Sequence, residues 1–123
     1  MKQLVLVFLG SGLGSVLRFG IGKYFNISTS GFPMGTFIVN ILGSFLVGII
    51  LGLALRGNTL SNNQVLFLAT GFCGGFTTFS AFAYENQIFL KSGDFTSFAL
   101  YTITSFVLGF SAVFFGMWAV KFL

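Results

Sequence analysis

Residues 71–80 read Gly-Phe-Cys-Gly-Gly-Phe-Thr-Thr-Phe-Ser, and they lie inside an uncharged run of the chain from residue 57 to residue 84. A Gly-Gly pair followed by two threonines weakens a helix, because glycine is flexible and threonine hydroxyls bond back to the backbone. We expect a break here, close to mid-membrane if the run spans a bilayer. Broken helices at that depth expose carbonyl and amide groups that commonly bind ions, and carbonyl oxygens favour a cation such as Na⁺. The other interpretation is a kink or tight crossing without an ion.

The composition around this stretch is that of a membrane protein. Of 123 residues, 55% are hydrophobic and 7% charged, whereas an average soluble domain has about 25% charged residues. A soluble globular domain, a disordered chain and a disulfide scaffold are therefore excluded. The sequence has no His and one Cys, which excludes the usual zinc sites, and it offers no nucleophile–base pair, so we do not expect an enzyme. The net charge of +4 favours an anion as the ion handled near its ends.

The spacing of the charged residues divides the chain into spans. These residues are Lys2, Arg18, Lys23, Arg56, Glu85, Lys91, Asp94 and Lys121. A helix needs about 20 apolar residues to cross a bilayer. We therefore predict an all-α integral membrane protein, a single transmembrane domain over residues 1–123, with spans at approximately 3–25, 33–55, 63–90 and 96–121. We do not expect a cleaved signal peptide, because Arg18 interrupts the first apolar run.

The positive charges give almost no preference for one orientation in the membrane. With four spans both termini share a side, and three basic residues fall on each side: Lys2, Arg56 and Lys121 on one, Arg18, Lys23 and Lys91 on the other. Either the insertion machinery fixes one orientation, or copies insert both ways and pair antiparallel. Three polar residues within the spans are hard to shield inside one small bundle, and this favours an oligomer. They are Arg18, Asn40 and Glu85.

Small residues recur every four positions, which is typical of close helix packing in lipid. Gly10 and Gly14 form one such row, and Asn40, Ser44, Gly48 and Gly52 form another. The amide of Asn40 has two interpretations: it links two helices, or it donates to a passing anion.

Aromatic and hydroxyl side chains mark the last two spans. Phe79 and Phe82 share one helix face with Glu85. Their rings either pack or offer an electropositive edge to a small anion. Tyr101 and Ser105 lie four apart in the fourth span, where they line a pore or bond to a neighbouring helix. Arg18 and Glu85 are functional candidates, because charges within a membrane span are costly.

These residues together resemble the Fluc (CrcB) family of bacterial fluoride channels. The likeness covers essentially the whole chain. It is carried by residues 14–18, by Gly35-Thr36-Phe37-Ile38-Val39-Asn40-Ile41-Leu42-Gly43-Ser44, and by residues 71–80 with Phe82 and Glu85. The run Gly-Gly-Phe-Thr-Thr-Phe-Ser combined with Asn40 is its most specific part.

The resemblance implies an antiparallel dual-topology homodimer in the bacterial plasma membrane, with two pores for passive export of fluoride and no nucleic-acid partner. The family's pore-lining Asn and Phe pair is matched by Asn40, Phe79 and Phe82, and parts of its polar track are matched by Ser80, Tyr101 and Ser105. The positions whose carbonyls hold a central structural Na⁺ are matched by Gly74 and Thr77. The span-one Arg and the vestibule Glu are matched by Arg18 and Glu85. Ala81 and Gly109 lack hydroxyls that some members carry at these positions.

Two other functions fit a small four-span protein. One is a proton-coupled drug exporter, which needs a central carboxylate in its first span, where this chain has Arg18. The other is a non-conducting membrane scaffold or accessory subunit.

Overall fold

The computed structural model describes residues 1–26, 31–57 and 59–123, and all regular structure within those ranges is helical. In chain order the elements are α1 (Lys2–Phe25), α2 (Met34–Leu55), α3 (Asn62–Val65), the π-helix η1 (Leu66–Cys73), α4 (Gly74–Phe76), α5 (Phe79–Ser92), α6 (Phe95–Ala119) and the 3₁₀-helix η2 (Val120–Phe122). Residues 27–30, between the first and second predicted spans, and Asn58, between the second and third, lie outside the described residues.

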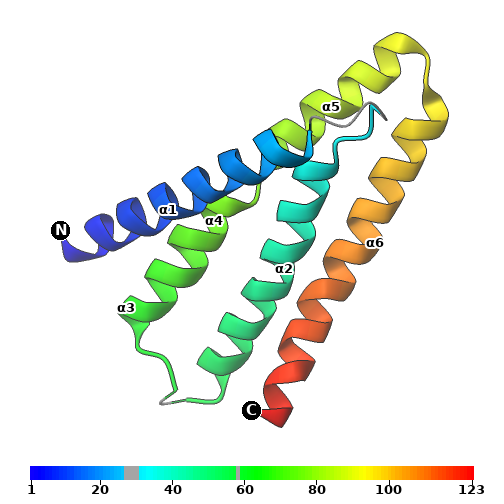
Figure 1. The fold of residues 1–123 in the computed structure, drawn as a ribbon. Helices are drawn as coiled ribbons and strands as arrows, with labels where there is room; N and C mark the ends of the chain where they lie inside the picture. The colour runs from blue at the N-terminus through cyan, green and yellow to red at the C-terminus, as the bar shows by residue number, and fades with distance from the viewer. Residues whose placement is uncertain (27–30, 58) are drawn as a thin grey trace.

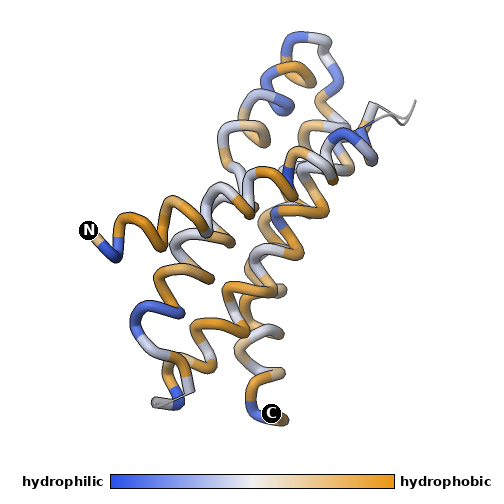
Figure 2. The backbone as a smooth tube through the Cα atoms, turned by 60° about the vertical axis from the view of Figure 1, so that its left-hand side comes forward, coloured by the Kyte–Doolittle hydropathy of each residue, from blue (hydrophilic) through white to orange (hydrophobic). Residues whose placement is uncertain are grey.

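Four helical spans in the described part of the chain are long and apolar enough to cross a membrane. They are Lys2–Phe25, Met34–Leu55, Asn62–Ser92 and Phe95–Phe122. Hydrophobic residues run along most of each span, while hydrophilic residues gather toward the chain ends and turns (Figure 2). The prediction of four membrane spans is therefore confirmed, with bounds close to those read from the charges.

Local sequence explains where the helices begin and end. Pro33 occupies the N-cap of α2, directly before its first turn. Gly93 ends α5 with a φ of +77°, a left-handed conformation that suits glycine. Asp94 then caps α6, because its Oδ1 accepts a hydrogen bond from the amide of Ser97 at 3.1 Å. Hydrogen bonds from the Ser97 side chain and then from its backbone amide hold the pKa of the Asp94 carboxyl below its usual value.

The helices form two closely packed pairs (Figure 1). Helices α2 and α6 run side by side along much of their length, and α1 crosses the line of η1 and α4. At the ends of α2 and α6, Arg56 Nη1 donates to the carbonyl oxygen of Val120 at 2.8 Å. The same carbonyl also accepts from the amide of Leu123 at 3.1 Å, so the bond from Arg56 links the end of α2 to the last turn of the chain.

Glycines permit both crossings, as the four-residue spacing predicts. A Cβ on Gly14 would overlap the backbone carbonyl of Phe72, and one on Gly48 would overlap that of Val113. Gly116 faces α2 in the same way, against the carbonyl of Phe45. The backbones of α1 and η1, and of α2 and α6, are therefore in direct contact.

Candidate functional site

The third span changes conformation at the two threonines. Thr77 has φ −86° and ψ 157°, and Thr78 has φ −150° and ψ 120°, so both are extended between α4 and α5. The Thr78 side chain caps α5 by accepting from the amide of Ala81 at 3.2 Å. The hydroxyl of Thr77 turns back to the carbonyl of Cys73 at 2.9 Å. The extended residues thus fall where the Thr pair weakens the helix.

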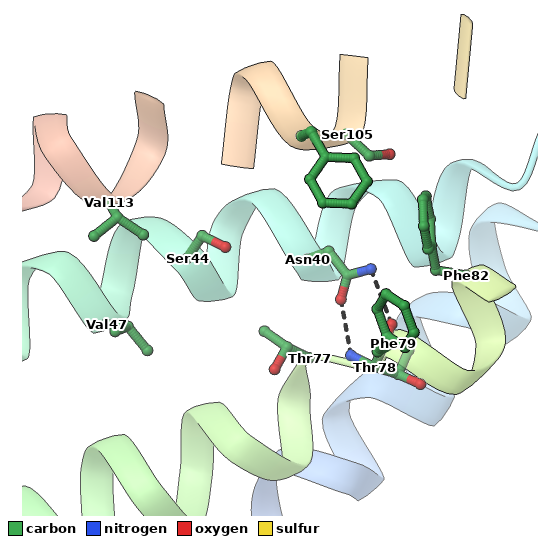
Figure 3. Close-up of a pocket in the computed structure, with 10 residues that line it drawn as sticks. Asn40, Ser44, Val47, Thr77, Thr78, Phe79, Phe82, Ser105 and Val113 are labelled. Carbon is green, nitrogen blue, oxygen red and sulfur yellow. Dashed lines mark hydrogen bonds between the residues drawn. The ribbon is translucent and has the colours of Figure 1, made fainter. Parts of the chain in front are cut away.

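Asn40 of α2 binds the backbone of Thr78 from both sides (Figure 3). Its Nδ2 donates to the Thr78 carbonyl at 3.1 Å, and its Oδ1 accepts from the Thr78 amide at 2.8 Å. The Asn40 amide therefore links two spans, as one of its two interpretations predicts. These two bonds use one of the two N–H groups on Nδ2, so a second donor remains.

Two carbonyl groups, that of Gly74 in α4 and that of Thr77 directly after it, lose their usual helical partners. The amide of Thr78, which would bond to Gly74 in a continuous helix, donates to Asn40 instead. The amide of Ala81, which would bond to Thr77, donates to the Thr78 hydroxyl. The carbonyl of Gly75, in contrast, accepts hydrogen bonds from side chains of α1.

Arg18 lies against the end of α4. Its Nε donates to the Gly75 carbonyl at 2.9 Å, and Ser15 Oγ approaches the same oxygen at 3.4 Å. A guanidinium at a helix C-terminus is also favoured by the helix dipole. Arg18 is thus bound to the backbone of the third span and is not only a charge at the membrane surface.

A pocket of about 300 Å³ lies between α2, the Thr77–Thr78 segment and α6. Its lining combines amide, hydroxyl and aromatic groups, and Figure 3 shows the labelled side chains around it. The residues are Asn40, Ser44, Val47, Thr77, Thr78, Phe79, Phe82, Ser105, Phe106 and Val113. With no charged side chain among them, this pocket offers an ion hydrogen-bond donors and ring edges alone.

A second pocket of about 570 Å³ carries the charged groups. Arg18, Lys23 and Glu85 line it, together with Thr36 and Thr78. Since Thr78 lines both pockets, the two meet at the extended segment. A charged opening therefore adjoins an uncharged polar pocket.

Glu85 is held by two hydroxyls. Thr36 Oγ1 donates to its Oε2 at 2.7 Å, and the Tyr101 hydroxyl donates to its Oε1 at 2.8 Å. Tyr101 is fully buried and Thr36 is 7% exposed, so these donors have fixed positions. The carboxylate is oriented between α2 and α6 by neutral partners, which sequence spacing did not indicate.

The predicted pore residues separate into two groups. Asn40, Phe79, Phe82 and Ser105 meet at the uncharged pocket. Tyr101 instead contacts the Phe82 ring, with centroids 5.0 Å apart, and bonds to Glu85. Ser80 is exposed, and its hydroxyl lies 3.2 Å from that of Thr78.

Sequence reasoning did not assign Ser44, Val113 or Phe106 to a pore, although all three line the pocket. Ser44 lies one helical turn after Asn40, so their shared helix face could have indicated that Ser44 also lines the pocket. Phe106 shares a helical row with Thr102 and Phe110, next to the row of Tyr101 and Ser105, but this position alone did not distinguish a pocket-lining ring from a lipid-facing one.

The chain resembles known proteins over nearly its full length. Residues 5–117 match the family model described as CrcB-like protein, Camphor Resistance (CrcB). A relative from Gloeothece citriformis is 47% identical, covering 98% of each chain. One from Phocaeicola vulgatus is 48% identical over 96% of this chain and 98% of its own, and one from Thermus thermophilus is 46% identical over 94% and 93%. All three are named fluoride-specific ion channel FluC.

Proposed function

The chain belongs to the CrcB family, and from that premise we propose that it is a fluoride channel that exports F⁻ passively from the bacterial cytoplasm. The family is one of ion channels and not of enzymes. The four spans and the family make the chain a multi-pass protein of a bacterial membrane. The proposed role is to lower cytoplasmic fluoride, which enters as HF and is trapped as F⁻ in a less acidic cytoplasm.

The observation that carries this proposal is the chemistry of the uncharged pocket. The free N–H of Asn40, the hydroxyl of Ser105 and the edges of Phe79 and Phe82 are all weak, neutral donors to an anion. Fluoride is small and strongly hydrated, so a dry path must replace water with several donors. Because none carries full charge, the ion can also leave.

The charged pocket forms the entrance of the proposed path. Arg18 and Lys23 raise the local concentration of anions at its lining. Glu85 would repel an anion, but each of its oxygens accepts from a hydroxyl, and these bonds hold it against α2 and α6. From this entrance F⁻ passes Thr78 to reach the pocket of Asn40.

The active form is an antiparallel homodimer with two pores and dual topology. Phe79 lines the pocket, yet 73% of its surface is exposed in the single chain, and a second copy would cover it. The even distribution of basic residues between the two sides agrees with insertion in both orientations.

A structural Na⁺ at the dimer centre fits the groups at the end of α4. The carbonyls of Gly74 and Thr77 have both lost their helical N–H partners, and hard cations prefer oxygen ligands. Apart from the neighbouring backbone of its own helix, a Cβ on Gly74 would approach no described atom closer than the Ala69 oxygen at 3.9 Å, so packing within the described chain does not require glycine there. When bound, Na⁺ would supply positive charge that joins the two copies.

The drug-exporter alternative lacks its essential group. Residues 2–25, which form α1, contain no Asp or Glu, and Glu85 in the third span is bonded to Thr36 and Tyr101. The scaffold alternative predicts no ion flux, so one experiment separates it from a channel.

The test is flux from liposomes that contain the purified protein and potassium fluoride. After valinomycin releases potassium, a fluoride electrode should record rapid fluoride efflux, and liposomes loaded with potassium chloride should show little chloride efflux. Absence of fluoride efflux above protein-free liposomes would refute the channel. Equal fluoride and chloride efflux would refute its selectivity.

A further inference from the structure

Phe82 is the buried ring of the uncharged pocket. It is 8% exposed, whereas Phe79 is 73% exposed, so the orientation of Phe82 is determined within the single chain. Its ring centroid lies 5.8 Å from that of Phe79 and 5.0 Å from that of Tyr101, with interplanar angles of 43° and 56°. Both are tilted contacts.

Phe106 of α6 makes a different contact with Phe82. The two centroids are 5.9 Å apart and the planes meet at 84°, which is an edge-to-face arrangement. Aromatic pairs favour this geometry, because the positive edge of one ring meets the negative face of the other. Of the ring contacts that the structure describes for Phe82, this is the one with edge-to-face geometry.

Phe106 also belongs to the pocket itself. It lines the pocket next to Ser105, so consecutive residues of α6 contribute a hydroxyl and a ring. Phe110 follows one turn later, with its centroid 5.8 Å from that of Phe106, but it does not line this pocket.

The orientation of Phe82 matters because an aromatic ring presents opposite electrostatic signs to an anion. Its edge attracts the ion and its face repels it. The terminal torsion of phenylalanine is broad, so packing must hold the ring plane. A leucine in place of Phe106 would fill similar space but would offer no ring face or edge to Phe82.

We propose that Phe106 is a positioning residue that holds the Phe82 ring with its edge toward the pocket, and so sets the rate and selectivity of anion passage. This inference rests on the proposed channel function. It assigns to α6 a second contribution to the uncharged pocket, beyond the hydroxyl of Ser105.

The experiment compares three variants in the liposome flux assay. Phe106→Leu should reduce fluoride efflux by about two- to tenfold and reduce the fluoride-to-chloride ratio, since the edge-to-face pair with Phe82 is lost. Phe106→Tyr keeps the ring and should remain close to wild type. Phe114→Leu is the matched control, because Phe114 lies on the same helix, is 63% exposed and is not part of the pocket lining.

Thermal unfolding of each purified variant excludes a folding defect as the cause, and Phe106→Met serves as a second non-aromatic variant if Phe106→Leu does not fold. The inference is overturned if the non-aromatic variants keep wild-type efflux and selectivity, or if Phe106→Tyr loses them equally. If the inference fails while the wild-type protein still conducts fluoride in the same experiment, the proposed channel function is unaffected.

Discussion

The side-chain amide of Asn40 and the backbone of Thr78 form a reciprocal pair of hydrogen bonds, of 3.1 and 2.8 Å, between α2 and the third span. The bond from Thr78 N–H replaces one that a continuous helix would make with Gly74. Asn40 thus stabilises the extended segment and leaves the Gly74 carbonyl free. One side chain connects the proposed anion path with the proposed cation site.

Replacing Asn40 with Asp should damage both stability and flux. The carboxylate cannot donate to the Thr78 carbonyl, and its charge repels an anion in the pocket. We expect a loss of about 1–3 kcal/mol in the free energy of unfolding, because a partly buried carbonyl loses its donor. Fluoride efflux should fall to the level of protein-free liposomes. Thermal unfolding in detergent and the electrode assay measure the two effects.

Asn63→Asp is the control for this change, because Asn63 lies at the start of α3, outside both pockets. It should leave both quantities near wild type. If Asn40→Asp retained normal efflux, Asn40 would not be a donor to the ion.

Much of the fold could be predicted because charge spacing and small-residue spacing act locally. The uncharged runs indicated the four spans, and the four-residue rows of small residues indicated the close helix crossings. The π-helix η1 was not expected, since its wider turns are not encoded by a simple residue pattern.

The site was predicted less completely, because its contacts depend on the register between spans. The bonds of Glu85 to Thr36 and Tyr101 join residues 49 and 16 positions apart in the sequence, and no periodicity relates them. Phe106 is one of 19 phenylalanines, and only the packing of α5 against α6 brings it to Phe82.

Two threonine-to-valine substitutions should differ in their effect on stability. Thr36 Oγ1 donates to Glu85, so Thr36→Val removes a donor from a carboxylate oxygen and should cost about 1–3 kcal/mol. Thr102 Oγ1 is buried and has no hydrogen-bond partner among the described residues, so Thr102→Val should be neutral or stabilising. Valine matches threonine in shape, so each acts as the control for the other in thermal unfolding. Equal destabilisation by both would contradict the assigned hydrogen bonds.

Gly116→Ala should separate α2 from α6. The new methyl group would overlap the carbonyl of Phe45, and backbone cannot move aside as a flexible side chain can. We expect a loss of about 1–3 kcal/mol in the free energy of unfolding, or failure to accumulate in the membrane. Gly20→Ala is the comparison, because a Cβ there meets nothing within 4 Å in the described chain. It should be neutral, or stabilising by up to about 1 kcal/mol.

Labelling of two engineered cysteines tests whether copies of the chain insert in both orientations. Native Cys73 is 1% exposed, so it contributes little background to labelling with a membrane-impermeant thiol reagent. Ser92→Cys lies at the end of the third span and Leu123→Cys directly after the fourth, on opposite sides of the membrane, and neither changes the balance of basic residues. If copies insert both ways, about half of each variant should be labelled from outside intact cells. Complete labelling of one and none of the other would show a single orientation and contradict the antiparallel dimer.

Gly74→Ala tests the dimer centre without disturbing the single chain. Gly74 is helical, and apart from its own neighbouring backbone the nearest described atom to a Cβ there would be the Ala69 oxygen at 3.9 Å. The substitution should therefore not destabilise the fold of one copy. If two copies meet around Na⁺ at this carbonyl, the methyl group occupies space that the partner or the ion needs. We expect a smaller dimer fraction by light scattering and a fluoride efflux that requires higher Na⁺ than wild type does. Gly12→Ala, also open within the described chain, should change neither, and a fully dimeric Gly74→Ala with normal Na⁺ dependence would place the dimer centre elsewhere.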